Sequence, residues 1–480
     1  MTDIIVIRNA DWVVGWDEAR AQHCFRRDGD VAFSAAGIVQ AGGRYDGPFA
    51  EERSGRGLMI MPGLIDIHCH SGDEPMAKGV FDDMGTPALY GNALYEYSTL
   101  LDFDDDPDAL AAGLTVMLCE LMQSGVTTVL DLTRAHGRWI DIMAESGVRG
   151  YVGPGFRQAA WRVVDSHRLD YEWNETRGRE RFAEALEFAD KALSHKSGRI
   201  SAILAPSQIE TCREDLLVDA QSEARKRGIS ISIHAAQTMA EHEELLRRTG
   251  LTAPQFMDRL GLLGPDLIIG HGIFLDHHSW TRQRTANDLT LLAERGAAVA
   301  HCPVAFARSG MTLDTVGRYQ RAGVTLGLGT DTYPFNLLEE MRQALLCARI
   351  TGRNFSEVST GDIFHAATVG GAKALRRSDI GKLAPGAKAD LVLVDLSHPT
   401  MQPVYDPLRS LLHCAAERAV RDVFVDGRQV VRDGKHMHLD YAAAAEALQG
   451  AQERALAKAP NVDLQHRPLA KLAPLSLPQD

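Results

Sequence analysis

Two histidines near the start of the chain have the spacing of a metal-binding pair. The apolar segment Pro62-Gly63-Leu64-Ile65-Asp66-Ile67-His68-Cys69-His70 ends in His68 and His70. If this segment is a β-strand, residues two apart point to the same face, so both imidazoles can reach one ion and Cys69 points away. A lone histidine pair is more often a packed or surface pair, so this prediction needs support from elsewhere in the chain.

Residues of matching chemistry stand at the ends of three later apolar runs: His234 after 229–233, His271 after 267–270, and Asp331 after 324–330. Three imidazoles and a carboxylate suit zinc or ferrous iron. A catalytic ion of this kind keeps one position open for water and lowers the pKa of that water to about 7. We therefore predict one divalent ion, zinc or iron, held by His68, His70, His234 and Asp331. Asp331 would also take the proton of the water, and His271 would act beside the ion as a base.

Such residues must be brought together by a fold that gathers strand ends at one face. Between about 63 and 380, helical patterns such as 110–121 and 213–227 separate eight apolar strand-like runs. The runs are 63–68, 126–131, 148–153, 200–205, 229–234, 266–270, 297–301 and 324–329. This alternation predicts an α/β fold of the (β/α)₈ barrel type, whose catalytic groups lie at the C-terminal ends of the strands. A doubly wound sheet is the alternative.

Both ends of the chain have a different pattern. Short β-like runs separated by turns fill residues 1–62 and return in 381–440. Each part is small alone, so we predict that the two together form one β-sandwich domain beside a barrel domain of residues 63–380. Residues 441–480 are predicted to form an alanine-rich helix and an arm that lies over the barrel or a neighbouring subunit, and we expect a homodimer or higher homo-oligomer.

Composition narrows the class of protein. The chain of 480 residues has a formal net charge of −13, which argues against a nucleic-acid or anionic-membrane partner. No apolar run reaches the roughly 18 residues needed to cross a bilayer, and the N-terminus has no signal-peptide pattern. The seven scattered cysteines fit reduced thiols. We therefore expect a cytoplasmic enzyme that acts on a small molecule.

The motifs together resemble the amidohydrolase superfamily, in the branch that contains triazine hydrolases, cytosine deaminase and guanine deaminase. The resemblance covers nearly the whole chain. It rests on the segment from Pro62 to His70, on His234 and His271, and on three further motifs: His301-Cys302-Pro303, Gly327-Leu328-Gly329-Thr330-Asp331 and Gly381-Lys382-Leu383-Ala384-Pro385-Gly386-Ala387-Lys388-Ala389-Asp390-Leu391. It implies a barrel with a small β-sandwich from both chain ends. It also implies one metal on His68, His70, His234 and Asp331, with His271 near the attacking water.

Two departures from the family pattern bear on the chemistry. Some branches bind two metals through a carboxylated lysine after the fourth strand, but 200–208 contains no lysine, which favours a single metal. Deaminases of this branch place Glu three residues after the third histidine ligand, where this chain has Gln237. Glutamine cannot donate and regain a proton as a carboxyl group does, although it can hydrogen-bond a carbonyl. Glu241 is a candidate substitute for that carboxyl, and a solvated charge on a helix is the simpler interpretation.

The substrate side is less specific in the sequence. The segment 71–103 follows the first histidine pair and is long enough to form a lid. Its Tyr90, together with Trp161 and Phe335, would give aromatic walls that suit a neutral substrate. After His301-Cys302-Pro303 the family usually has a Ser-Asn pair, where this chain has Val304-Ala305-Phe306-Ala307-Arg308. Arg308 is a candidate contact for an anionic group.

These observations predict a metal-dependent hydrolase that cleaves a non-peptide C–N bond of the amide, urea or carbamate type, with His271, Asp331 and Gln237 as catalytic residues. Phenylurea and thiocarbamate hydrolases of the same branch are the expected relatives. The alternative is an aminohydrolase that deaminates a purine, pterin or triazine ring. A metal-binding scaffold without catalysis is a third possibility, against which the complete ligand set argues.

Overall fold

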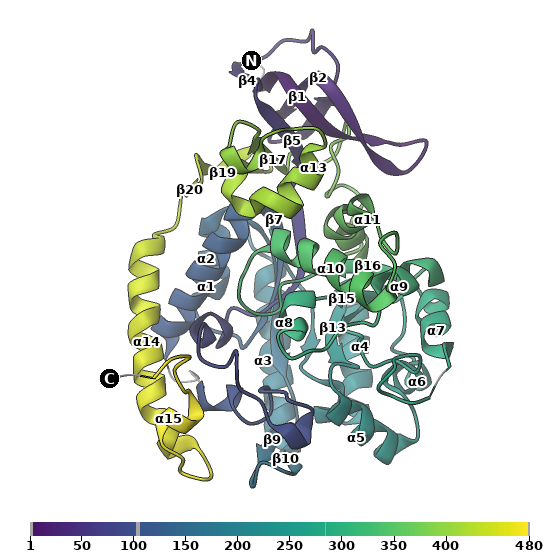
Figure 1. The fold of residues 1–480 in the computed structure, drawn as a ribbon, viewed down its shortest axis with the longest axis vertical. Helices are drawn as coiled ribbons and strands as arrows, with labels where there is room; N and C mark the ends of the chain where they lie inside the picture. Colours follow the sequence, from purple (N-terminus) through teal and green to yellow (C-terminus); the bar gives the residue numbers. More distant parts are fainter. Residues whose placement is uncertain (1–2, 102–105, 284, 479–480) are drawn as a thin grey trace.

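The computed structural model describes residues 3–101, 106–283 and 285–478 (Figure 1). All eight predicted strands of the central region form, and together they make one parallel sheet. They are β6 (Leu64–Cys69), β7 (Val126–Thr133), β8 (Arg149–Phe156), β11 (Ile200–Ala202), β13 (Ile231–Ala235), β14 (Leu267–His271), β15 (Ala298–His301) and β16 (Thr325–Leu328). The short strand β12 (Ala205–Pro206) pairs with β8 beyond the end of β11.

The order of the strands is that of a barrel. Neighbouring strands run β11-β8-β7-β6-β16-β15-β14-β13, so the last strand of the central region pairs with the first. The two ends of this order are joined by the bridges Leu204↔Ile231 and Gln208↔His234. This is the barrel-type arrangement that the alternation of strands and helices predicts. Because the strands are parallel, their C-terminal ends lie on one face, which is where His68, His234, His271 and Asp331 stand.

Helices surround the strands, and capping residues explain several of their boundaries. Asp106 caps α1 by accepting a hydrogen bond from the Ala109 N–H, and Gly228 ends α4 in the left-handed conformation. The helices of this layer are α1 (Pro107–Gln123), α2 (Trp139–Ser146), α3 (Glu175–Leu193), α4 (Glu214–Arg227), α5 (Met239–Thr249), α6 (Ala253–Arg259), α7 (Asn287–Arg295), α8 (Pro303–Ala307), α9 (Val316–Ala322), α10 (Leu337–Gly352), α11 (Thr360–His365) and α12 (Gly371–Ala374). A hairpin, β9 (Ala159–Val163) and β10 (Leu169–Trp173), interrupts the connection from β8 to α3.

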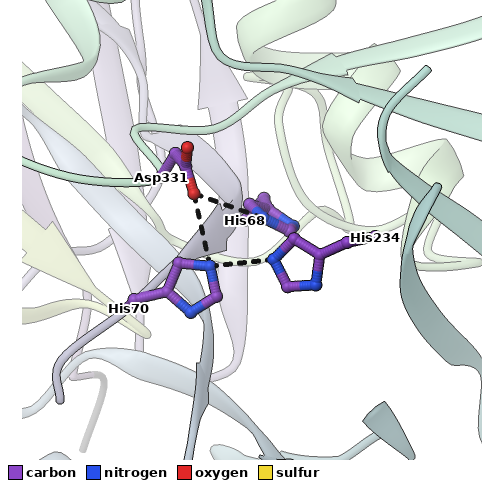
Figure 2. Close-up of side chains that lie close together, drawn as sticks. All are labelled: His68, His70, His234 and Asp331. Atoms are coloured by element: carbon purple, nitrogen blue, oxygen red, sulfur yellow. Dashed lines mark hydrogen bonds and ion pairs between the residues drawn. The ribbon is translucent and has the colours of Figure 1, made fainter. Parts of the chain in front are cut away.

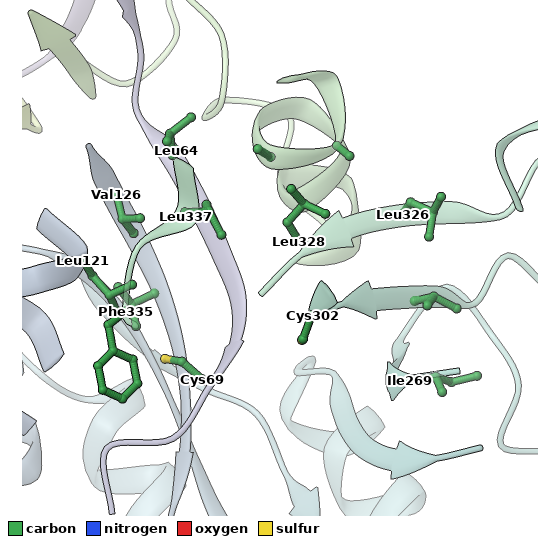
Figure 3. Packing of buried hydrophobic residues seen from close by; sticks show 14 of the residues in the cluster. Leu64, Cys69, Leu121, Val126, Ile269, Cys302, Leu326, Leu328, Phe335 and Leu337 are labelled. Carbon is green, nitrogen blue, oxygen red and sulfur yellow. The ribbon is translucent and has the colours of Figure 1, made fainter. Parts of the chain in front are cut away.

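The core between strands and helices is apolar. Leu64, Val126, Leu326 and Leu328 are among its buried side chains (Figure 3). Cys69 belongs to this cluster and is fully buried, so it points away from its histidine neighbours as the strand period requires.

The two ends of the chain share a second sheet, at the top of Figure 1, with its own apolar core. β17 pairs with β5, and this pairing joins the strands of the N-terminal part to those of the C-terminal part. The strands are β1 (Ile5–Asp17), β2 (Gln22–Ser34), β3 (Gly37–Ala41), β4 (Glu51–Ser54), β5 (Leu58–Pro62), β17 (Leu391–Asp395), β18 (Val420–Val425), β19 (Arg428–Arg432) and β20 (Lys435–His436). The short helix α13 (Pro407–Ser410) lies between β17 and β18 in sequence.

The last part of the chain packs against the segment that follows the first histidine pair. α14 (Tyr441–Val462) and α15 (Leu469–Leu472) run along one side of the barrel (Figure 1). Ala451 and Ala455 of α14 pack with Met76 and Ala77, and Leu472 packs with Tyr97 and Leu100. Among the described helices, none is long and apolar enough to cross a membrane.

Candidate metal centre

Four side chains converge at the C-terminal ends of the barrel strands, as the sequence predicts. His68, His70, His234 and Asp331 each offer one ligand atom, and these atoms all lie within 4.8 Å of one another (Figure 2). The Asp331 carboxylate oxygen is 3.3 Å from His70 Nε2 and 3.6 Å from His68 Nε2. His70 keeps about 20% of its side chain exposed, whereas His68, His234 and Asp331 are buried.

The hydrogen bonds of the rings show that this cluster fits a metal ion. His70 Nδ1 lies at the Leu132 carbonyl and His234 Nδ1 at the Ser207 carbonyl. A carbonyl oxygen only accepts, so both Nδ1 atoms carry a proton, and each ring presents a lone pair at Nε2 when it is neutral. These two Nε2 atoms face each other at 3.1 Å. Facing lone pairs repel unless a cation lies against them, and backbone carbonyls that fix the tautomer are the usual supports of histidine ligands.

Backbone contacts hold the ligands in register. The Asp331 N–H donates to the His68 carbonyl at 2.8 Å, and the His70 N–H donates to the Asp331 carbonyl at 3.1 Å. Asp331 has a φ of 61°, a left-handed conformation that is unusual for a residue with a side chain and is typical of functional sites. Asp66 connects β6 to the segment after β16, because its carboxylate accepts hydrogen bonds from the His68 N–H and from the Thr330 hydroxyl.

Two glycines make room for His68. A Cβ atom at Gly270 would lie 2.6 Å from the His68 ring, and one at Gly329 would lie 2.6 Å from the His68 carbonyl oxygen. Both distances are too short for any other residue without displacement of the ligand. The glycines after the apolar runs of β14 and β16 therefore belong to the site, and they explain part of the Gly-Leu-Gly-Thr-Asp motif.

Electrostatics separates the charged from the neutral members of the site. Burial lowers the pKa values of His68, His234 and His271, and the last two lie well below the ordinary value. Burial also opposes ionisation of Asp331, but His271, His68 and His70 outweigh it and hold the pKa of this carboxyl well below its usual range. Burial also opposes protonation of His70, but the hydrogen bond and the charge of Asp331 outweigh it and raise the pKa of His70 to about 9. Without an ion the site therefore holds the Asp331 carboxylate beside a protonated His70 and neutral His68, His234 and His271, and a metal ion would displace the proton of His70.

His271 lies beside the four ligands, where a base would stand. Its ring centroid is 4.7 Å from that of His68 and 5.3 Å from that of His234, and the ring also contacts Phe306. Both ring nitrogens are buried without a hydrogen-bond partner among the described residues. Like Asp331, His271 has a positive φ, of 85°. A neutral imidazole with both nitrogens unsatisfied can accept a proton or orient a water.

Gln237 follows His234 by three residues and is 8% exposed. Within the described residues its side chain makes no hydrogen bond, so its amide is free to bind a substrate group. Glu241 does not replace the missing carboxyl. Its two oxygens accept the backbone N–H groups of Ala236 and Gln237 at 2.6 Å and 2.8 Å, and the side chain is buried. The interpretation of Glu241 as a solvated helix charge is therefore wrong as well.

The structure gives the four predicted substrate contacts other partners. Tyr90 is 39% exposed, its hydroxyl donates to Glu243, and its ring stacks on Trp280. Phe335 is fully buried in the apolar core (Figure 3). Trp161 donates its indole N–H to Glu210 at 3.0 Å. Arg308 pairs with Asp82 at 2.8 Å and with the Thr332 hydroxyl. Their role in substrate binding stays a prediction.

The described part of the predicted lid, residues 71–101, contacts several other parts of the chain; residues 102–103 lie outside the described residues. Asp82 ties it to Arg308 after β15, and the Tyr95 hydroxyl ties it to Thr238 after β13. Glu96 accepts from Ser166 between β9 and β10 and from Arg467 of the C-terminal arm. These contacts fix the segment to parts of the chain that follow two barrel strands and to the C-terminal arm; its role as a lid stays a prediction.

Two acidic residues near the site escaped the sequence analysis. Glu74 lies four residues after His70, and burial together with the charge of Asp331 raises the pKa of its carboxyl to about 7. Glu210 follows the bridge residue Gln208, and burial raises its pKa to about 7 as well. The short spacing from His70 to Glu74 could have indicated from the sequence that Glu74 lies near the site. No local pattern distinguishes Glu210 from an ordinary surface glutamate.

Comparison with known proteins agrees with this geometry. Residues 59–430 match the family model described as "Amidohydrolase family". A 5-methylthioadenosine/S-adenosylhomocysteine deaminase of Natronomonas pharaonis is 30% identical over 391 residues, which are 81% of this chain and 84% of the relative. A 5′-deoxyadenosine deaminase of Methanosarcina mazei is 27% identical over 407 residues, 84% of this chain and 88% of the relative.

Solved structures show the same fold. An adenosine deaminase from Xanthomonas campestris with bound zinc superposes with a TM-score of 0.81 at 26% identity, over 94% of this chain and 98% of that chain. A triazine hydrolase variant superposes with a TM-score of 0.80 at 21% identity, over 94% and 100% of the two chains.

The chain belongs to the amidohydrolase family, and the predicted resemblance is confirmed. It is a hydrolase of carbon–nitrogen bonds other than peptide bonds, with a candidate metal site of three histidines and one aspartate. The relatives are named deaminases, so they support the alternative of the sequence analysis over amide, urea or carbamate cleavage.

Proposed function

We propose that the protein is a metal-dependent aminohydrolase that replaces the exocyclic amino group of a purine-type ring with oxygen and releases ammonia. The observation that carries this proposal is the convergence of His68, His70, His234 and Asp331 in a chain whose relatives are named deaminases of adenosine derivatives. The proposed substrate class is adenosine modified at the 5′ position, as in the names of those relatives.

We propose zinc as the ion, since the similar adenosine deaminase structure contains it and three imidazoles with a carboxylate suit it. Bound there, the ion would act as a Lewis acid and lower the pKa of a water molecule. Asp331 would accept the proton of that water, because its carboxylate is ionised and its oxygen lies 3.3 Å from His70 Nε2. Neutral His271 can hydrogen-bond the oxygen that adds to the ring.

Gln237 is the feature that this proposal must accommodate. Deamination adds water to a C=N bond, so one proton goes to the ring nitrogen and another to the departing ammonia. The Gln237 amide can orient the ring by hydrogen bonds, but it supplies neither proton. Asp331 would therefore have to carry the protons of the water to both nitrogens.

A second candidate function follows from the same residue. Hydrolysis of an amide, urea or carbamate attacks a carbonyl carbon, which needs no protonated ring nitrogen. There Gln237 would hydrogen-bond the substrate, and only the departing amine would take a proton. This candidate releases an organic amine, or ammonia only from a primary amide.

The two functions are separated by their products. Purified enzyme loaded with zinc would be incubated with 5′-methylthioadenosine, S-adenosylhomocysteine and 5′-deoxyadenosine, and separately with N-substituted amides, ureas and carbamates. Ammonia would be measured by a coupled assay, and the organic product by mass spectrometry. The Asp331→Asn variant is the matched control for contaminating activity. We expect ammonia and an inosine-type product; faster release of an organic amine from the second group would favour the alternative, and no turnover of either group would overturn both.

A further inference from the structure

The turn after the third histidine ligand has an unusual backbone. β13 ends at Ala235, and Ala236 has a φ of 52° before α5 begins at Met239. A left-handed alanine is unfavourable, because its Cβ crowds the backbone. The carbonyl of Ala236 accepts two N–H groups, from Ile273 at 2.8 Å and Phe274 at 2.9 Å, so the turn is also tied to the segment that follows His271.

The buried side chain of Glu241 binds the backbone of this turn. It lies in the first turn of α5, which Thr238 caps by accepting the Glu241 N–H. Its side chain is 2% exposed, and its carboxylate accepts from the Ala236 N–H through one oxygen and from the Gln237 N–H through the other. A carboxylate is the side chain that offers two acceptor oxygens in one plane, so two adjacent N–H groups are satisfied together.

We propose that Glu241 is a positioning residue: its carboxylate fixes the strained Ala236–Gln237 backbone and thereby sets where the free amide of Gln237 meets the substrate. The inference rests on the proposed function, because it assigns Gln237 a contact with the substrate. Within the described residues, the hydrogen bonds of the Glu241 side chain go to the backbone of Ala236 and Gln237 and not to the ligand side chains. It acts through two backbone bonds on a residue three positions after His234.

The chemistry of the Glu241→Gln substitution makes the inference testable. Glutamine keeps the size of the side chain, but its NH₂ group would face one of the two N–H donors. One buried N–H then loses its acceptor, and the strained turn relaxes. We expect turnover to fall about 10- to 100-fold, the range of a lost orienting contact, while the metal stays bound.

A double-mutant cycle distinguishes positioning from a general loss of stability. Turnover would be measured, with whichever substrate the enzyme accepts, for Glu241→Gln, Gln237→Ala and the double variant. If Glu241 acts through Gln237, the double variant is no slower than Gln237→Ala alone. If the two losses multiply, Glu241 supports the fold or another residue and the inference is wrong. Glu187→Gln, an exposed glutamate of α3, is the control for loss of a helix carboxylate.

Two further measurements need no substrate, so they separate this inference from the proposed function. In hydrogen exchange, Glu241→Gln should speed exchange in the peptide over 235–240 at least about 10-fold and leave the strands β6 and β16 unchanged. The visible spectrum of the cobalt-substituted enzyme should stay unchanged, since the ligands keep their places. Unchanged exchange, or an altered spectrum, would overturn the inference. If Glu241→Gln does not fold, Glu241→Asp, which keeps the charge on a shorter side chain, is tested in the same cycle.

Discussion

Asp331 and His68 are joined twice, through the backbone and through their side chains. The Asp331 N–H donates to the His68 carbonyl at 2.8 Å, and the Asp331 carboxylate lies 3.6 Å from His68 Nε2. The backbone bond extends the pairing of β16 with β6, the last and first strands of the barrel. The ligand set is therefore complete only when the barrel has formed, and metal binding is linked to folding.

This link predicts how metal affects the protein. Elemental analysis should give about one divalent ion per chain, since one cluster of four ligands is present in the described residues. Removal of the ion by a chelator should abolish activity and lower Tm, and zinc should restore both, because an ion that binds only the folded state stabilises it. Two tightly bound ions per chain would contradict the single site.

Asp331→Asn keeps the size of the side chain but removes the charge and the proton acceptor. We expect kcat to fall at least about 10³-fold, as for loss of a main catalytic group. The variant must be assayed at full metal occupancy, confirmed by elemental analysis, so that lost binding is not mistaken for lost chemistry. Near-normal turnover under these conditions would exclude the role given to Asp331.

Gln237 variants test the departure from the family pattern. Gln237→Ala should lower turnover about 10- to 100-fold through loss of an orienting hydrogen bond. Gln237→Glu adds a titratable proton, so it should speed ammonia release from aminopurines about 10-fold or more. Steady-state rates of ammonia release for the three proteins check this. If Gln237→Glu is slower than the wild type on every aminated ring, the ring nitrogen does not receive its proton from this position.

The buried Glu210 predicts a pH dependence of stability. Burial raises its pKa from 4.5 to about 7. As pH rises from 4.5 to 7, the unfolded chain releases a proton that the folded protein keeps, so folding stability falls with pH across this window. The full shift corresponds to about 3 kcal/mol. In Glu210→Gln the fall should be smaller than in the wild type by about this amount, because other buried carboxyls with raised pKa values, such as Glu74 and Asp66, still contribute. Urea unfolding at about pH 5 and pH 8 would show the difference. An equal loss in variant and wild type would contradict the raised pKa.

The C-terminal arm predicts how easily the site opens. Arg467 donates to Glu96 of the lid segment at 2.8 Å, and both side chains are largely buried. Arg467→Ala leaves that carboxylate without its cation, a loss of about 1.5–3 kcal/mol for a charged hydrogen bond. Chelator should then remove the metal about 10- to 100-fold faster, because the lid segment opens more often. The exposed Arg432→Ala in β19 is the control, and unchanged removal in Arg467→Ala would mean that the arm does not hold the lid segment.

The sequence predicted the parts of the molecule that follow from strand periodicity. All eight barrel strands and the four converging side chains were found, because each ligand directly follows an apolar run and parallel strands place such residues at one face. The contacts of Tyr90, Trp161 and Arg308 were not predictable in this way. Their partners Glu243 of α5, Glu210 and Asp82 lie on other segments of the chain, and the relative positions of these segments depend on the assembled barrel. The burial of Phe335 in the apolar core was not predictable either, because it depends on packing in the assembled barrel.

The position of the arm has a consequence for synthesis of the protein. During synthesis the ligand set is complete once Asp331 has been added, whereas α14 and Arg467 leave the exit tunnel later. Domains fold as units during synthesis. A nascent chain therefore passes through a stage in which all four ligands have been synthesised but Arg467 does not yet hold the segment 71–101. During that interval a metal ion can reach the four ligands before the ion pair of Arg467 with Glu96 has formed.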